Sequence, residues 1–289
     1  MLPGLPGGAL LGGVVAAEWL PILGWRGMFL LGGVLPVIMI AVMFFCPESP
    51  GYLVARGRPG DQTKARMLIH QATKVPVDQS TALVPELGGR SRGSIAALFD
   101  QKYRATTIAV GAVYLANWIA WFLLLQWMPT ALHMLGLSTS DAAFGTIVVN
   151  GAFILFSFPI SFLLPRVQLR KLLLGMFTVG ILVSLGLGLA GSQWTVIFVL
   201  IALAGLGIGG QQLVLNYLVA GTYSTELRGV ATGFSIGVGR LGSIVGSALG
   251  GTLLAAFGPN GYFAVLAVPL AVAAIATVLV RAPKTPSSH

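Results

Sequence analysis

Long apolar runs with few polar interruptions dominate the chain. They do not show the alternation of apolar and polar residues that is typical of a half-buried strand, and each is long enough to cross a bilayer as a helix of about 20 residues. Eight spans are predicted, at residues 3–20, 26–46, 105–130, 141–164, 171–190, 194–220, 229–256 and 260–281. The pattern therefore predicts an all-α integral membrane protein with eight transmembrane helices, because the spans of a transmembrane β-barrel are short and alternating.

One long hydrophilic stretch, residues 47–104, divides these spans into two groups. The predicted organisation is two helices of an N-terminal bundle in 1–46, a central loop in 47–104, and a six-helix bundle with a short tail in 105–289. Short apolar runs at Met67–Ile69 and Ile95–Phe99 indicate that the loop is partly helical. Their amphipathic setting predicts that the loop lies on the inner leaflet of the membrane.

Composition and charge support a membrane protein and predict its orientation. The chain has 289 residues, of which 56% are hydrophobic and 9% charged, whereas a soluble domain has about 25% charged residues. All but two of its 17 Lys and Arg residues fall in the central loop or in loops on the same side of the membrane; the exceptions are Arg26 and Arg240. The positive-inside rule then predicts that this side and both termini are cytoplasmic, in a cell (inner) membrane. Basic residues distributed in this way do not indicate a nucleic-acid partner.

An internal repeat relates the beginning of the chain to its end. GALLGG at 8–13 matches GSALGG at 246–251, and the turn LGWRGMF at 23–29 matches FGPNGYF at 257–263. Such similarity is expected of two homologous halves, which are common in secondary transporters. Since only the second copy is preceded by four further spans, the chain is expected to represent the last eight helices of a twelve-helix protein, and the missing N-terminal half would be its partner.

Arg240 is the only charge in the apolar segment 229–251 and lies about 16 Å from its start, near the midplane of a bilayer. An arginine at this depth costs about 2.5–3.5 kcal/mol and snorkels to water with difficulty. Its planar guanidinium suits a carboxylate, which it can hold through two parallel hydrogen bonds. No Asp or Glu lies in the interior of the last six spans. Arg240 is therefore predicted to bind either an acidic residue of the missing half or an anionic substrate.

Other polar and aromatic residues in the spans are candidates for lining the same cavity. They are Asn117, Trp121, Asn150 and Gln211. Trp121 belongs to an aromatic stripe with Tyr114 and Trp118, and such stripes are also typical of helix packing. Buried amides serve equally well as hydrogen-bonding groups between helices, so this alternative stays open. The glycines at 233, 237, 242, 246 and 250 predict a small-residue packing face rather than a ligand site.

Several segments resemble the major facilitator superfamily. PESPGYLVARGR at 47–58 is similar to that superfamily's sequence after the sixth helix, TYSTELRGVATG at 222–233 to its entry into the eleventh, and GWRGMFLLGGVLP at 24–36 to the start of the sixth. Within the superfamily, NWIAWFLLLQWMPTAL at 117–132 and SIGVGRLGSIVG at 235–246 most resemble the aromatic acid:proton symporters. This resemblance implies import of benzoate, hydroxybenzoate or a related carboxylate by alternating access. It implies a proton gradient as driving force and no cofactor.

The resemblance also implies cytoplasmic gating residues, because matching motifs place Glu48, Glu226 and Arg228 at helix ends. Arg166 belongs to the loop LLPRVQLRKLL, where Pro165 stands in the position at which the superfamily usually has Asp. The basic half of that charge pair is kept and the acidic half is lost. Gating through this loop is therefore expected to differ from the family pattern.

Other functions remain as alternatives to carboxylate import. A sugar, polyol or drug transporter of the same superfamily would share the fold, although an arginine at the midplane disfavours a cationic drug. A truncated fragment that does not transport is a further alternative. An enzyme is not predicted, because no nucleophile–base pair and no metal-ligand spacing occur. GVGRLG at 237–242 matches the dinucleotide-binding pattern formally, but it lies within a membrane helix rather than between a strand and a helix.

Overall fold

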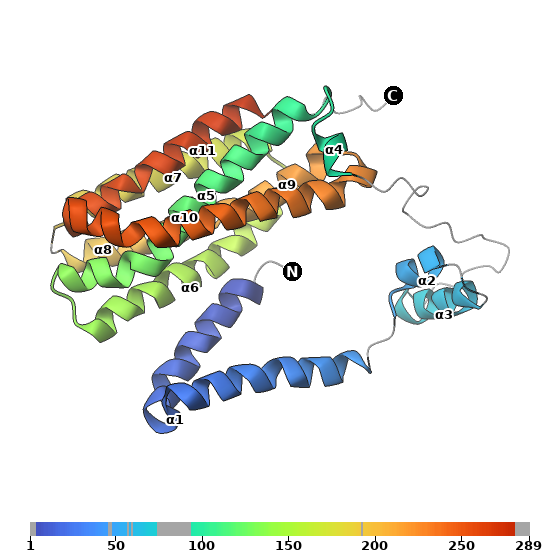
Figure 1. The fold of residues 1–289 in the computed structure, drawn as a ribbon, viewed down its shortest axis with the longest axis horizontal. Coiled ribbons are helices and arrows are strands. Elements are labelled where there is room, and N and C mark those ends of the chain that lie inside the picture. The colour runs from blue at the N-terminus through green and yellow to red at the C-terminus, as the bar shows by residue number, and fades with distance from the viewer. Residues whose placement is uncertain are drawn as a thin grey trace. The chain divides into compact units, whose positions relative to one another are not determined.

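A computed structural model describes residues 4–45, 48–56, 58, 60–73, 94–191 and 193–280. Within these ranges all regular structure is helical, as predicted (Figure 1). The helices are α1 (Gly4–Met43), α2 (Pro50–Arg56), α3 (Asp61–Thr73), α4 (Ile95–Leu98), α5 (Arg104–Met134), α6 (Thr139–Leu163), α7 (Leu169–Leu189), α8 (Trp194–Ala204), the π-helix η1 (Gly205–Gly209), α9 (Gln211–Thr222), α10 (Thr225–Val265) and α11 (Ala267–Leu279).

Six helical stretches of the described residues are long and apolar enough to cross a membrane. One of them, Glu226–Leu279, has 54 residues, and a helix of that length extends about 80 Å, enough for two crossings of a hydrocarbon core about 30 Å thick. It contains the predicted span 229–256 and most of the predicted span 260–281. The stretch Ile22–Met43 contains most of the second predicted span, 26–46, and the described part of the first predicted span falls in α1 before Gly24. The chain is thus a multi-pass membrane protein.

Two glycines break the long helices α1 and α10 in the same way. Gly24 has φ 62° and ψ 177°, and Gly258 has φ 65° and ψ 177°. This region of backbone conformation is essentially restricted to glycine, since a Cβ would be strained there. The two breaks fall at equivalent positions of the turns LGWRGMF and FGPNGYF. The internal repeat seen in the sequence is therefore also a repeat of backbone structure.

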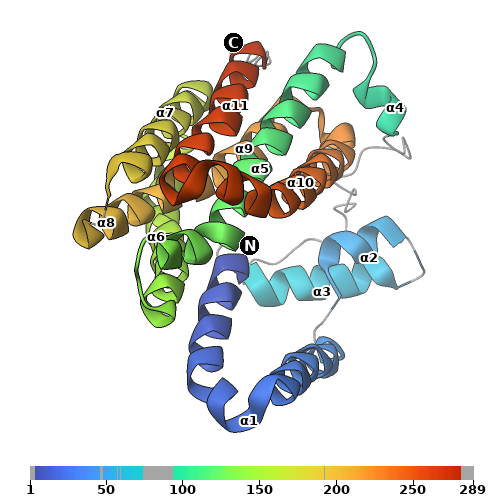
Figure 2. The same cartoon turned by 60° about the vertical axis from the view of Figure 1, so that its left-hand side comes forward.

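The helices from α5 to α11 form one bundle. Helix α5 packs along α10 and α11, and α11 in turn packs along α7 (Figures 1 and 2). The largest fully buried side chains include Tyr114 and Phe177 from α5 and α7, and Tyr262 and Phe263 from α10. The hydroxyl of Tyr262 donates to the carbonyl of Leu123 on α5. This core fixes α5, α9 and α10, the three helices that hold the candidate site.

The glycine-rich face of α10 packs directly on α5 over part of its length. A Cβ on Gly242, Gly246 or Gly250 would collide with Leu115, Ile119 or Trp127 respectively, so only glycine permits these contacts. The predicted packing face is confirmed at these three positions. At Gly233 and Gly237 a Cβ would meet no described atom within 4 Å, so for these two glycines the packing face stays a prediction.

The central loop is partly helical, as predicted. Met67–Ile69 lies in α3, and Ile95–Leu98 forms the single turn of α4, which is capped by the Ser94 side chain accepting from the Ala97 amide. Helices α2 and α3 pack together and bury Leu53 and Ala65. The chain divides into two compact units, and α2 and α3 belong to the one formed by Val15–Arg92. Residues 74–93 lie outside the described part of the loop.

Candidate functional site

Arg240 lies near the middle of the unbroken part of α10, between Thr225 and the break at Gly258. Its side chain is exposed on the surface of the bundle. The guanidinium carbon Cζ lies 5.0 Å from the centre of the Trp118 ring on α5, which is a cation–π distance. The ion pairs found within the described residues do not involve Arg240. The arginine is therefore held by an aromatic face and keeps its hydrogen-bond donors available for an anion.

Trp118 begins a series of hydrogen bonds that joins α5 to α9. Its indole Nε1 donates to Oε1 of Gln212 over 2.7 Å. Nε2 of Gln212 donates to Oδ1 of Asn216 over 3.2 Å, and the Tyr114 hydroxyl donates to the same oxygen over 2.7 Å. Tyr114 is fully buried, whereas Trp118, Gln212 and Asn216 are half-buried. We call these four side chains the polar relay.

The aromatic stripe predicted on α5 continues toward Trp121. This ring packs edge-on against Phe153 of α6, with centroids 6.0 Å apart. It also lies against Gly209, where a Cβ would come within 2.8 Å of the ring. On the other side, Trp118 stacks on Phe122 with centroids 5.7 Å apart. The structure thus assigns Trp121 mainly to helix packing and Trp118 to the surface that Arg240 shares.

The remaining predicted lining residues lie inside the bundle. Asn117 is 2% exposed, and its Oδ1 has no hydrogen-bond partner among the described residues. Gln211 is fully buried; its Nε2 donates to the carbonyl of Gly207, and its Oε1 is likewise unpartnered. Asn150 is 5% exposed and donates to the carbonyl of Thr146 over 2.8 Å. The structure buries these three amides rather than bringing them to the exposed surface of Arg240; on α9 it is Gln212 that bonds Trp118, the residue whose ring contacts Arg240.

Sequence reasoning also missed the π-helix η1, which lies directly before α9 in the chain. Its glycines allow very close approach of neighbouring helices: a Cβ on Gly205 would lie 2.7 Å from a carbonyl oxygen of α6, and one on Gly207 would lie 2.7 Å from the backbone nitrogen of Gly180 on α7. Single π-turns are frequent at functional sites. The dense glycine run GLGIGG at 205–210 was the available signal.

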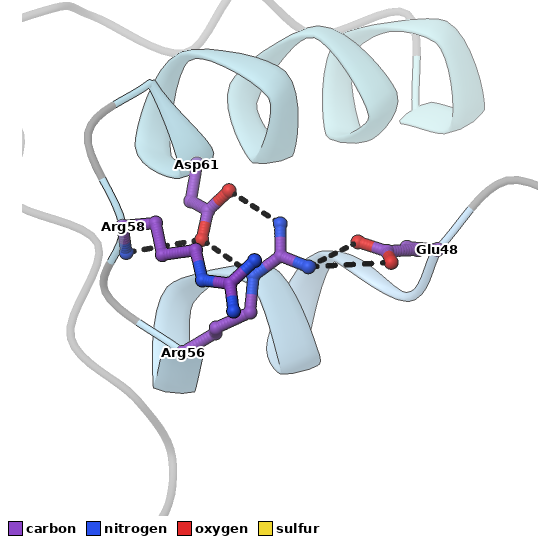
Figure 3. A network of polar contacts seen from close by, with 4 residues as sticks. All are labelled: Glu48, Arg56, Arg58 and Asp61. Carbon is purple, nitrogen blue, oxygen red and sulfur yellow. Dashed lines mark hydrogen bonds and ion pairs between the residues drawn. The ribbon is translucent and has the colours of Figure 1, made fainter.

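Of the predicted gating residues, Glu48 belongs to a charge network with α2 and α3, shown in Figure 3. Arg56 bonds Glu48 at 3.3 Å and holds Asp61 through Nε–Oδ2 and Nη2–Oδ1 bonds of 2.9 and 2.7 Å. The backbone amide of Arg58 also donates to Asp61, over 3.0 Å. The Arg56 hydrogen bonds chiefly lower the pKa of Asp61, to about 2 despite its burial, and Asp61 in turn raises the pKa of Arg56.

The other predicted gating residues lie at helix ends with exposed side chains. Arg166 is in the turn between α6 and α7, and Glu226 and Arg228 are in the first turns of α10. No ion pair to any of these three is found within the described ranges. In the same part of the chain, no group of three or more His, Cys, Asp or Glu residues is arranged to hold a metal ion.

Comparison with known proteins gives the family. The family model described as "Sugar (and other) transporter" matches residues 7–288. The chain is 30% identical to a 4-hydroxybenzoate transporter of Pseudomonas aeruginosa over 254 residues, covering 86% of the chain and 55% of that protein. It is 29% identical to a gallate transporter of Pseudomonas putida over 285 residues, covering 96% of the chain and 62% of that protein. It is also 25% identical to a benzoate transport protein of Acinetobacter baylyi over 280 residues (94% and 59%).

The chain therefore spans about three fifths of the length of these curated relatives. All three are transporters rather than enzymes, and the match covers nearly all of the chain described above. The bundle from α5 to α11 and the repeated helix breaks at Gly24 and Gly258 are in keeping with this match. The chain belongs to the sugar (and other) transporter family of the major facilitator superfamily, and within it most resembles the aromatic acid transporters.

Proposed function

We propose that the protein imports an aromatic or related organic carboxylate, such as benzoate or a hydroxybenzoate, together with protons. The observation that carries this proposal is the exposed guanidinium of Arg240 on the face of Trp118, in the middle of an apolar membrane helix. A charge in hydrocarbon is retained where it faces a wet cavity and an opposite charge. The similar proteins are transporters of 4-hydroxybenzoate, gallate and benzoate, which supports the same substrate class.

Arg240 and its neighbours have complementary roles in this proposal. The guanidinium binds the carboxylate through two hydrogen bonds. The rings of Trp118 and Phe122 provide an aromatic surface beside it on which a planar substrate stacks. The bundle from α5 to α11 forms one side of the cavity and exposes it alternately to the two sides of the membrane by rocking against a second bundle. Uptake is driven by the proton gradient, and no cofactor takes part.

The proposed location is the cell (inner) membrane, with both termini and the central loop in the cytoplasm. The basic residues of that loop and of the turns at Arg166 and Arg228 support this orientation. Glu48 and Arg56 in the loop, together with Arg166, Glu226 and Arg228, would then lie on the cytoplasmic side, where they gate access to the cavity.

The test is ligand binding to the purified 289-residue chain in lipid nanodiscs. Benzoate should bind and benzamide should not compete with it, because only the carboxylate pairs with Arg240. Arg240→Lys keeps the charge but loses the two-pronged geometry, so we expect affinity for benzoate to fall at least tenfold. Arg104→Lys, an exposed arginine at the start of α5, is the matched control and should retain binding. Equal affinity for benzoate and benzamide, or unchanged binding by Arg240→Lys, would overturn the proposal.

A further inference from the structure

We propose that Trp118 fixes the direction of the polar relay, so that Asn216 offers only N–H donors to the ligand and selects a carboxylate whose ring carries an acceptor substituent, such as a hydroxyl oxygen. In this assignment Trp118 is a positioning residue and Asn216 a specificity-determining residue. The inference rests on the proposed function, since it concerns the second polar group of the ligand that Arg240 binds.

The direction of the relay follows from the chemistry of the indole. Tryptophan Nε1–H is a donor and cannot accept, so the Gln212 atom that faces it at 2.7 Å must be the oxygen. The amide nitrogen of Gln212 is thereby turned toward Asn216, and the Asn216 atom that receives it at 3.2 Å must also be an oxygen. The orientation of both amides, which is normally ambiguous, is set by one group that has no alternative.

The relay leaves Asn216 with a defined set of free groups. Its Oδ1 accepts from Gln212 and from the Tyr114 hydroxyl, which uses both lone pairs of a carbonyl oxygen. Within the described residues its Nδ2 has no recorded partner, and the side chain is half-buried rather than enclosed. The group that Asn216 presents to a ligand is therefore an amide NH₂, which donates and does not accept.

Tyr114 and Trp118 make this arrangement rigid. Tyr114 is fully buried and bonds Asn216 over 2.7 Å, so it anchors the inner end of the relay. Trp118 anchors the other end, and the same ring lies beneath the Arg240 guanidinium. The cation that binds the carboxylate and the donor that reads the rest of the ligand are thus connected through one indole. A ligand that contacts both Arg240 and Asn216 therefore meets hydrogen-bond donors at its carboxylate and at its other polar group.

The expected selectivity is for acceptors and against donors. A phenolic oxygen keeps an in-plane lone pair and can accept from Nδ2, whereas the lone pair of an aromatic amine is delocalised into the ring and accepts poorly. One net hydrogen bond at a half-buried site corresponds to an affinity gain of about three- to tenfold. Hydroxybenzoate should therefore bind more tightly than benzoate, and 4-aminobenzoate should show no such gain.

The experiment is calorimetric titration of the purified 289-residue chain in nanodiscs with benzoate, 3- and 4-hydroxybenzoate, and 4-aminobenzoate. For the unmodified chain we expect at least one hydroxybenzoate to bind about three- to tenfold more tightly than benzoate. Asn216→Ala removes the donor, and Trp118→Phe removes the indole N–H while keeping a ring beneath Arg240. Both should bring the ratio of the two affinities close to one. Gln126→Ala removes an exposed amide of α5 outside the relay and should keep the ratio.

The outcomes separate the two proposals. If no carboxylate binds the chain, the proposed function fails, and the selectivity assigned to the relay fails with it. If benzoate binds but Asn216→Ala and Trp118→Phe both keep the hydroxybenzoate ratio, the relay assignment alone is overturned. A gain for 4-aminobenzoate equal to that for 4-hydroxybenzoate would overturn it as well, because a donor-only site cannot favour a ligand donor. The ratio of hydroxybenzoate to benzoate affinity also distinguishes this role of Asn216 and Trp118 from a merely structural one, since loss of folding would weaken the binding of every ligand alike.

Discussion

Arg56 holds the carboxylate of Asp61 through two parallel hydrogen bonds of 2.7 and 2.9 Å, and this pair fastens α2 to the start of α3 (Figure 3). The pKa of Asp61 is lowered to about 2, first by the hydrogen bonds from Arg56. A carboxyl whose pKa is lower in the folded than in the unfolded state stabilises the folded state above its unfolded pKa, near 4. That stabilisation is lost as the pH falls through the folded value, so the helix pair should loosen between about pH 4 and pH 2.

We expect Asp61→Asn to loosen α2 and α3 already at neutral pH, because the neutral amide no longer pairs with Arg56. The measurement is hydrogen exchange of peptides from residues 50–73 in the intact chain, corrected for the intrinsic effect of pH. Exchange should increase in the variant and show no further pH-dependent step between pH 4 and pH 2. Glu48→Gln is the control. The Glu48 carboxylate is half-exposed and lies 3.3 Å from Arg56, farther than Asp61 does, so this substitution should change hydrogen exchange little. An unchanged acid transition in Asp61→Asn would contradict the assignment.

A second prediction concerns the break in α10. Gly258→Ala should destabilise the bundle by about 1–3 kcal/mol, since a non-glycine residue is strained at φ 65° and ψ 177°. A Cβ at this position meets no described atom within 4 Å, so the cost comes from the backbone alone. The Cβ of Gly233→Ala would also meet no described atom within 4 Å. Gly233 lies in regular helix, however, so this substitution should stabilise the bundle by up to about 1 kcal/mol. Denaturant unfolding in detergent compares the two. Equal stabilities would show that the break is not strained by a side chain.

The orientation of the loop can be tested by cysteine labelling. Gln62 is exposed on α3, and Gln62→Cys in a background lacking the single native cysteine (Cys46→Ser) provides one accessible thiol. An impermeant maleimide should label it in inside-out vesicles and leave it unlabelled in intact cells. Labelling from outside intact cells would place the central loop on the opposite side and reverse the proposed topology.

Transport itself is expected to need a second bundle. The 289 residues expressed alone should not accumulate labelled 4-hydroxybenzoate, because alternating access requires two bundles that rock about the site. Co-expression with the first four helices of a transporter from the same superfamily should restore uptake that a protonophore abolishes. Membrane levels of the chain, measured in both strains, serve as the control. Saturable, protonophore-sensitive uptake by the 289 residues alone would refute this expectation.

Much of the fold follows from the apolar pattern, since a lipid environment leaves few alternatives to helices. Arg240 was identifiable because a charge is rare at that depth. Which of Gln211 and Gln212 faces Trp118 could not be predicted from the sequence. Adjacent helical residues point about 100° apart, and the directions in which α9 residues point cannot be extrapolated from those of α8. The π-helix η1 adds one residue to the helical turn between α8 and α9, which rotates the side-chain directions of all residues that follow. Gln211 is thereby directed inward and Gln212 toward Trp118.

The hydrogen bonds between α5 and α9 have a mechanical consequence. Tyr223 bonds Thr107 over 3.0 Å, Asn216 bonds Tyr114, and Gln212 bonds Trp118. The spacing between successive bonded residues is the same on both segments, which run in opposite directions, so the three bonds fix one register between them. Shifting α5 along α9 by even one turn would break all three bonds at once, so these two helices form one stiff lever. Helix α10 is coupled to α5 in the same way, because Trp127 Nε1 donates to the carbonyl of Ser247 over 2.9 Å and the Tyr262 hydroxyl donates to the carbonyl of Leu123. When the molecule changes shape, α5, α9 and α10 should therefore move as one unit, and Arg240 should move together with the polar relay rather than relative to it.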